Sequence, residues 1–127
     1  MSGQSESAWD SFSNTIEKLH KRISQSKAVN VNATNLKDQA QEVVQVYFRQ
    51  IHPELQSLGV DITLIAQVTE SMQALFKLSK GTHSKKVYLG LLKPLIKSMM
   101  DVSGAIELRH AEREFLSRSS TSIIHVN

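Results

Sequence analysis

Apolar residues recur every three or four positions along most of the chain, and this spacing predicts an all-helical protein. The first such run extends from residue 7 to about residue 26, and Ser7 followed by Asp10 is typical of a helix start. Its apolar positions form one narrow stripe: Trp9, Phe12, Ile16, Leu19 and Ile23. A stripe this narrow is typical of helices that pair with another helix, either of the same chain or of another molecule. We predict that these five residues form an oligomer interface.

The second and third helical runs carry broader apolar stripes. Thr34 or Asn35 can cap the second helix, which we expect to end at His52 because Pro53 excludes the preceding residue from the helical region. The stripe of this helix comprises Leu36, Ala40, Val43, Val44, Tyr47, Phe48 and Ile51. Residues 54–59 are predicted to form a short turn, and Asp61 to cap the third helix. The residues expected to face one way on that helix are Ile62, Ile65, Val68, Met72, Leu75 and Phe76.

The fourth helix is predicted to run from about Ser84 to at least Met100. Its core-facing positions are Tyr88, Leu91, Leu92, Leu95, Ile96, Met99 and Val102. Pro94 lies inside this pattern, and the residue whose carbonyl its ring presses on is Gly90, which has no Cβ to add crowding. We therefore predict a kinked helix rather than a broken one. Ser and Gly at positions 103 and 104 weaken the helix and can separate a further helical stretch over residues 105–116.

These patterns predict an all-α protein, an antiparallel bundle of four to five helices with a long kinked fourth helix. Residues 1–6 are polar and are predicted to be disordered. Residues 7–116 form the bundle domain. Residues 117–127 are predicted to form a Ser-rich linker and an apolar tail, which docks back, pairs with something or marks a domain boundary.

Composition narrows the functional classes. The chain has 127 residues, enough for one domain, and no cysteine, which removes disulfides, thiolate chemistry and Cys-ligated metals. No Gly-rich phosphate loop follows a strand, and no histidine pair is joined by a third ligand. No signal peptide or apolar run of about 20 residues is present, so we expect a cytoplasmic protein that does not enter a membrane. We predict no enzymatic activity, no cofactor and no metal.

Charge is distributed unevenly along the chain. Between Ser71 and Met100 there is no acidic residue, whereas six lysines occur there. Four of them, Lys77, Lys80, Lys85 and Lys86, flank a predicted turn in which Gly81 takes a left-handed conformation and Thr82 or Ser84 caps the next helix. Lysines at a helix start oppose the helix dipole, so this turn is predicted to bind an anion. The predicted phosphate or nucleic-acid ligands are Lys77, Lys80, Thr82, His83, Ser84, Lys85, Lys86 and Lys93.

The preferred function is a non-catalytic helical assembly or interaction module whose basic turn contacts phosphate, with DNA or RNA backbone as the source. Its protein partner would be a second copy of the chain or a larger assembly. Two alternatives compete with nucleic-acid binding. The lysines can be a solvated surface on a pure oligomerisation or adaptor domain. The chain can also be a metal-independent ribonuclease, for the following reason.

Arg118 and His125 are separated by six residues near the end of the chain. This spacing resembles the Arg-x(4–6)-His signature of the HEPN family of small all-helical ribonucleases. The resemblance covers only these two residues and their spacing. It implies that Arg118 and His125 line an RNA-cleaving cleft formed by a dimer. In the family the motif begins a core helix, whereas here it falls in the predicted Ser-rich tail.

Overall fold

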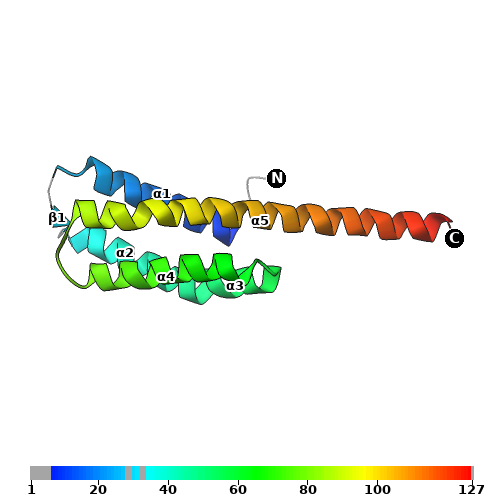
Figure 1. Ribbon diagram of the computed structural model, residues 1–127, viewed down its shortest axis with the longest axis horizontal. Helices are drawn as coiled ribbons and strands as arrows, with labels where there is room; N and C mark the ends of the chain where they lie inside the picture. The colour runs from blue at the N-terminus through cyan, green and yellow to red at the C-terminus, as the bar shows by residue number, and fades with distance from the viewer. Residues whose placement is uncertain (1–6, 28–29, 32–33, 127) are drawn as a thin grey trace.

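The computed structural model describes residues 7–27, 30–31 and 34–126, which form an all-α helical bundle (Figure 1). The elements are α1 (Ala8–Gln25), β1 (Asn30–Val31), α2 (Thr34–Val46), the π-helical turn η2 (Tyr47–Ile51), α3 (His52–Leu58), α4 (Ile62–Ser79), β2 (His83–Ser84) and α5 (Lys85–Val126). The predicted fold class is confirmed. Residues 1–6, for which disorder was predicted, lie outside the described residues.

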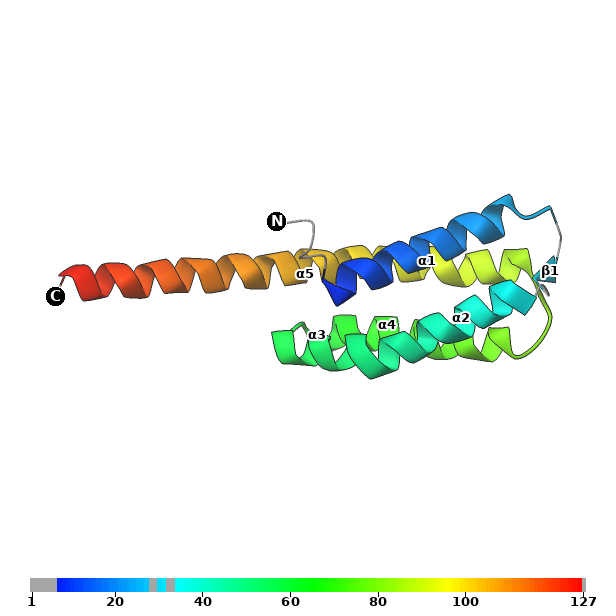
Figure 2. The same ribbon diagram turned by 180° about the vertical axis from the view of Figure 1, so that it is seen from behind.

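The long helices lie side by side and alternate in direction (Figures 1 and 2). α5 packs against α4 and α1, and α2 packs against the same two helices from the other side. As a result, α1 and α4 end where α2 and α5 begin. The two-residue strands β1 and β2 pair antiparallel at that end of the bundle.

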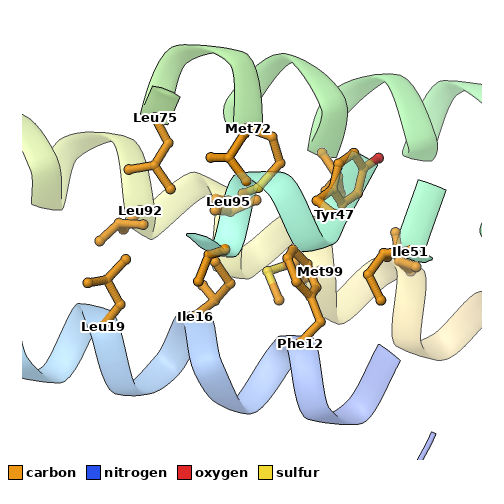
Figure 3. Packing of buried hydrophobic residues seen from close by; sticks show 14 of the residues in the cluster. Phe12, Ile16, Leu19, Tyr47, Ile51, Met72, Leu75, Leu92, Leu95 and Met99 are labelled. Carbon is orange, nitrogen blue, oxygen red and sulfur yellow. The ribbon is translucent and has the colours of Figure 1, made fainter. Parts of the chain in front are cut away.

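The stripe on α1 packs inside this chain, so the predicted oligomer interface is wrong. Its members are all buried in the single chain: Trp9, Phe12, Ile16, Leu19 and Ile23. In Figure 3, Phe12, Ile16 and Leu19 point from α1 towards residues of the other helices such as Leu95. Trp9 is 3% exposed, and its Nε1 donates a hydrogen bond of 2.9 Å to Ser103 Oγ on α5. The stripe is narrow because α1 contacts the bundle along a narrow face, and this chain supplies its partners.

The second helical run does not end at Pro53. α2 continues through η2 into α3, and Pro53 occupies the first turn of α3. Proline is accepted there because the N–H it lacks would have no partner within the new helix. The prediction of a helix end at His52 and of a turn over residues 54–59 is therefore wrong. His52 is half-buried and lies with its ring centroid 5.9 Å from that of Tyr47.

The left-handed turn lies after α3, not in the lysine-rich segment. Gly59 has φ of 74° and ends α3, whereas Gly81 is not among the described residues with positive φ. Gly81 N instead donates to Leu78 O at 3.2 Å, which closes a turn without a left-handed residue. Asp61 caps α4 as predicted, with Oδ1 accepting from Thr63 N at 2.7 Å. Ile62, expected to face the same way as Ile65 and Val68, is 81% exposed.

α5 is one uninterrupted helix of 42 residues. It continues through Pro94, as predicted, while the bend there stays a prediction. The predicted weakness at Gly104 does not divide it, and Ser103 is tied to Trp9 by a hydrogen bond. Residues 117–126 are helical where a Ser-rich linker was predicted. The helix leaves the bundle after Ile106 and projects beyond it (Figures 1 and 2).

Candidate functional site

One end of the bundle gathers positive charge from four helices. This basic end is where α1 and α4 end and α2 and α5 begin, and its cations lie within about one helical turn of those termini. They are Lys21, Arg22 and Lys27 from α1 and the segment after it, Lys37 from α2, Lys77 and Lys80 from α4, and Lys85 and Lys86 from α5. Among the described residues, Asp38 is the carboxylate within the same distance. The opposite end of the bundle carries Asp10, Asp61 and Asp101.

The end of α4 holds two of these lysines in different ways. Lys80 lies at the C-cap of α4, and its Nζ sits 4.5 Å from the centroid of the Phe76 ring, in cation–π contact. Lys77 is exposed in the last turn, where a cation is favoured by the helix dipole. The buried Ser79 donates from Oγ to Phe76 O at 2.7 Å, which satisfies a terminal carbonyl.

The segment between α4 and α5 is fixed by pairing with β1. Val31 pairs with His83 and Asn30 with Ser84. Ser84 then caps α5, with Oγ accepting a hydrogen bond of 3.3 Å from Val87 N. A Cβ added at Gly81 would lie 3.2 Å from His83 Nε2, so the imidazole covers this glycine. The predicted cap at Ser84 is confirmed, and His83 is held against the turn rather than extended into solvent.

Lys85 is a structural anchor in this chain. Its Nζ donates to Ser26 O at 2.8 Å and to Ser24 O at 3.2 Å. These are carbonyls at the C-terminal end of α1, where the helix has unpaired acceptors and partial negative charge. The charge predicted to be unsatisfied at the start of α5 therefore meets the end of another helix. Lys85 is not freely available to an added anion.

The structure brings most of the predicted site together and adds to it. Lys77, Lys80 and Lys86 are exposed at the basic end. Lys93 lies eight residues into α5, about 12 Å along the helix from its start. The structure adds cations that were not predicted, Lys21, Arg22, Lys27 and Lys37, which come from the other side of the bundle. The sequence did carry a signal for these cations. Antiparallel helices joined by short connections bring the end of α1 beside the start of α5.

Beneath the basic end, Tyr88 is buried in the first turns of α5. Its hydroxyl has no hydrogen-bond partner among the described residues, and burial raises the pKa of the phenol above its usual value. Tyr47 in η2 has a pKa raised by the same cause, but its hydroxyl is 2.7 Å from Thr69 Oγ1. Both phenols are therefore neutral at physiological pH and serve packing.

A groove of about 640 Å³ runs between α1 and α2. Phe12, Leu19, Val43 and Val46 are among its apolar lining residues. Its polar lining residues include Lys18, Lys21, Arg22, Gln25, Gln39, Glu42 and Gln50. The positive character of the basic end thus continues along one side of the bundle.

The described residues supply no other chemical centre. Nowhere in 7–27, 30–31 and 34–126 do three metal-ligating side chains gather. In the same ranges, no helix has both the length and the apolar character that crossing a membrane requires. Arg118 is exposed on the projecting part of α5, hydrogen-bonded to Glu114, and the side chain of His125 lies outside the description. Comparison of the chain with protein-family models, curated protein sequences and solved structures gives no match.

Proposed function

We propose that this protein is a non-catalytic helical module whose basic end binds the phosphate backbone of a nucleic acid. The observation that carries the proposal is the convergence of cations from α1, α2, α4 and α5 on one end of the bundle, with Asp38 as the nearby carboxylate. Among the described residues, both ion pairs lie on the projecting part of α5, so no carboxylate pairs with these cations.

The chemistry of the basic end favours backbone contact over base recognition. Lysine is a flexible point charge that follows phosphates without reading sequence. Phe76, the aromatic residue beside Lys77 and Lys80 in α4, is half-buried and has Lys80 over one face of its ring. Binding should therefore be strongly dependent on salt and weakly dependent on sequence.

The test uses two matched double variants of exposed lysines. Lys77→Gln with Lys86→Gln removes two charges from the basic end, and Lys93→Gln with Lys97→Gln removes two from the side of α5. Anisotropy of short labelled DNA and RNA duplexes, titrated between roughly 50 and 200 mM salt, gives the slope of log affinity against log salt. We expect the first variant to reduce the slope by about two and the second to leave it close to the original.

Two results would contradict the proposal. Equal losses in both variants would mean diffuse attraction to a positive protein. Unchanged affinity at low salt in the first variant would leave the lysines as a solvated surface. The oligomerisation alternative is favoured by a separate observation, the exposed apolar side chains of Leu108, Phe115 and Leu116 on α5. Nothing described around Arg118 favours the ribonuclease alternative over these two.

A further inference from the structure

A second groove, between α2 and α4, shares a lysine with the basic end. The two helices lie side by side, and the groove between them has a volume of about 670 Å³ (Figures 1 and 2). Its lining includes Gln45 from α2, Phe48 and Arg49 from η2, and Gln73, Phe76 and Lys77 from α4. Lys77 is the shared residue. The groove therefore combines aromatic rings with cations, next to a surface that is already positive.

Phe48 supplies an exposed aromatic surface in this groove. It is 40% exposed, whereas phenylalanine is more often buried. The ring meets Tyr47 edge-on at 5.2 Å between centroids and lies 6.5 Å from the ring of His52. Tyr47 is in turn fixed to α4, since its hydroxyl lies 2.7 Å from Thr69 Oγ1. The Phe48 ring is therefore oriented by its neighbours while part of its surface stays open.

The backbone that carries Phe48 and Arg49 is the π-helical turn η2. In this turn His52 N donates a hydrogen bond to Tyr47 O, five residues earlier. Turns of this kind are rare and are frequently found at functional sites. The groove between α1 and α2 differs from this one, because its aromatic residue, Phe12, is only 3% exposed.

The cations of the groove have no acidic partner in the part of the chain that the structure describes. Neither Arg49 nor Lys77 forms an ion pair there. Lys80 adds a third positive charge next to the groove, over the ring of Phe76. The groove therefore favours a ligand that has both negative charge and a flat apolar surface.

Two carboxylates limit the positive stretch without lining it. Asp38 lies in the first turns of α2, at the basic end, and Glu70 lines the next hollow along α4. From Gln45 to Arg49 the groove follows about 6 Å of helix. This length suits a single base rather than a long apolar segment.

We propose that the groove binds an unpaired base of a single-stranded nucleic acid, which stacks on Phe48 while Arg49 and Lys77 contact the neighbouring phosphates. Every base has a flat π surface, so the stacking selects unpaired strands without selecting a sequence. The side-chain amides of Gln45 and Gln73 can donate or accept, so they adapt to different base edges. A base in a duplex is already stacked, and extruding it costs free energy. Duplexes are therefore bound through phosphate contacts alone.

This inference rests on the proposed function and specifies its ligand as single strands. An acidic protein segment is the competing ligand for a cationic groove. The lysines of the basic end, which continue from Lys77 through Lys80 to Lys86, favour a polymer with a negative charge on every unit over a segment with a few acids.

The test compares the effect of one substitution on single strands and on duplexes. Anisotropy of labelled oligonucleotides of equal length and mixed sequence is measured with the original protein and with Phe48→Leu. We expect the variant to bind single strands about tenfold more weakly and duplexes less than about twofold more weakly. The salt dependence should not change, because no charge is removed. Stacking does not involve the sugar, so single-stranded DNA and RNA should show the same loss.

Three further variants serve as controls. Phe115→Leu changes an exposed phenylalanine on the projecting part of α5 and should leave both affinities unchanged. Phe48→Trp restores an aromatic face and should bind single strands at least as tightly as the original protein. Arg49→Gln should lower the salt slope by about one for single strands and leave the slope for duplexes close to the original. Circular dichroism and thermal unfolding check that each variant is folded.

The outcomes separate this inference from the proposed function. Equal losses for single strands and duplexes in Phe48→Leu, or a Phe48→Trp protein that binds single strands no better than Phe48→Leu, would overturn the inference. Duplex binding that depends on Lys77 and Lys86 would then still support the proposed function. If neither kind of oligonucleotide binds at about 50 mM salt, both are wrong, and an acidic protein segment becomes the ligand to test.

Discussion

The two halves of α5 share one backbone conformation but have different surroundings. From Lys85 to Ile106 the helix is held by tertiary packing, with Tyr88, Leu92 and Leu95 fully buried against α1 and α4. From Glu107 onwards its described side chains are exposed, and it is held by helical hydrogen bonds, by local ion pairs and by the contact of Arg109 with Gly59. Regular helical geometry is therefore no measure of how firmly a segment is stabilised.

Hydrogen exchange should give the largest difference between the halves. At low protein concentration, amides near Leu92 and Leu95 should exchange only on global unfolding, at least about a thousandfold slower than in an unstructured chain. Amides from 110 to 118 should exchange within about tenfold of the unstructured rate, because no packing must be broken to open them. Strong protection of both halves at high dilution would show that the comparison is wrong.

The same substitution, leucine to alanine, should lower the free energy of unfolding by a few kcal/mol more in the first half of α5 than in the second. Leu95→Ala removes a buried side chain and should cost about 3 kcal/mol, through lost transfer energy and a cavity. Leu108→Ala removes an exposed one and should change the stability of the monomer by less than about 0.5 kcal/mol. Urea unfolding at low concentration measures both. Comparable losses would mean that Leu108 is packed in solution.

The start of the first half allows a smaller and sharper comparison between adjacent lysines. Lys85→Gln should lower the free energy of unfolding by about 1 kcal/mol, because Nζ no longer neutralises the carbonyls of Ser24 and Ser26. Lys86→Gln should change it by less than about 0.5 kcal/mol, because this side chain is exposed. Thermal unfolding of the two variants at one pH and salt concentration checks the difference. A more stable Lys85→Gln protein would restore the view that this charge is repelled by α5.

The fold followed from the sequence because its signals are local. Periodic apolar positions, Ser7 and Asp61 as caps, and the tolerance of Pro94 within a helix all depend on neighbouring residues. The failures depend on tertiary context. The spacing of Trp9 and the other apolar residues of its stripe shows that a narrow face of this helix is covered. It does not show which element covers that face. Pro53 was read as the end of one helix, although the same residue is equally suited to the first turn of the next.

The candidate site could be predicted only in part for a similar reason. The acid-free stretch between Ser71 and Met100 identified Lys77, Lys80 and Lys86, which remain exposed. Adding Arg22 and Lys37 required the order in which the helices pack. That Lys85 meets the end of α1 could not be seen from its position at a helix start, because its partners lie 59 and 61 residues earlier in the chain.

The continuity of α5 sets a spacing between distant surfaces. Its 42 residues extend about 63 Å without a joint. The part from Glu107 to Val126 accounts for about 30 Å of this length. Any surface at the far end of α5 is therefore held about 60 Å from the basic end, at a distance that the helix itself fixes.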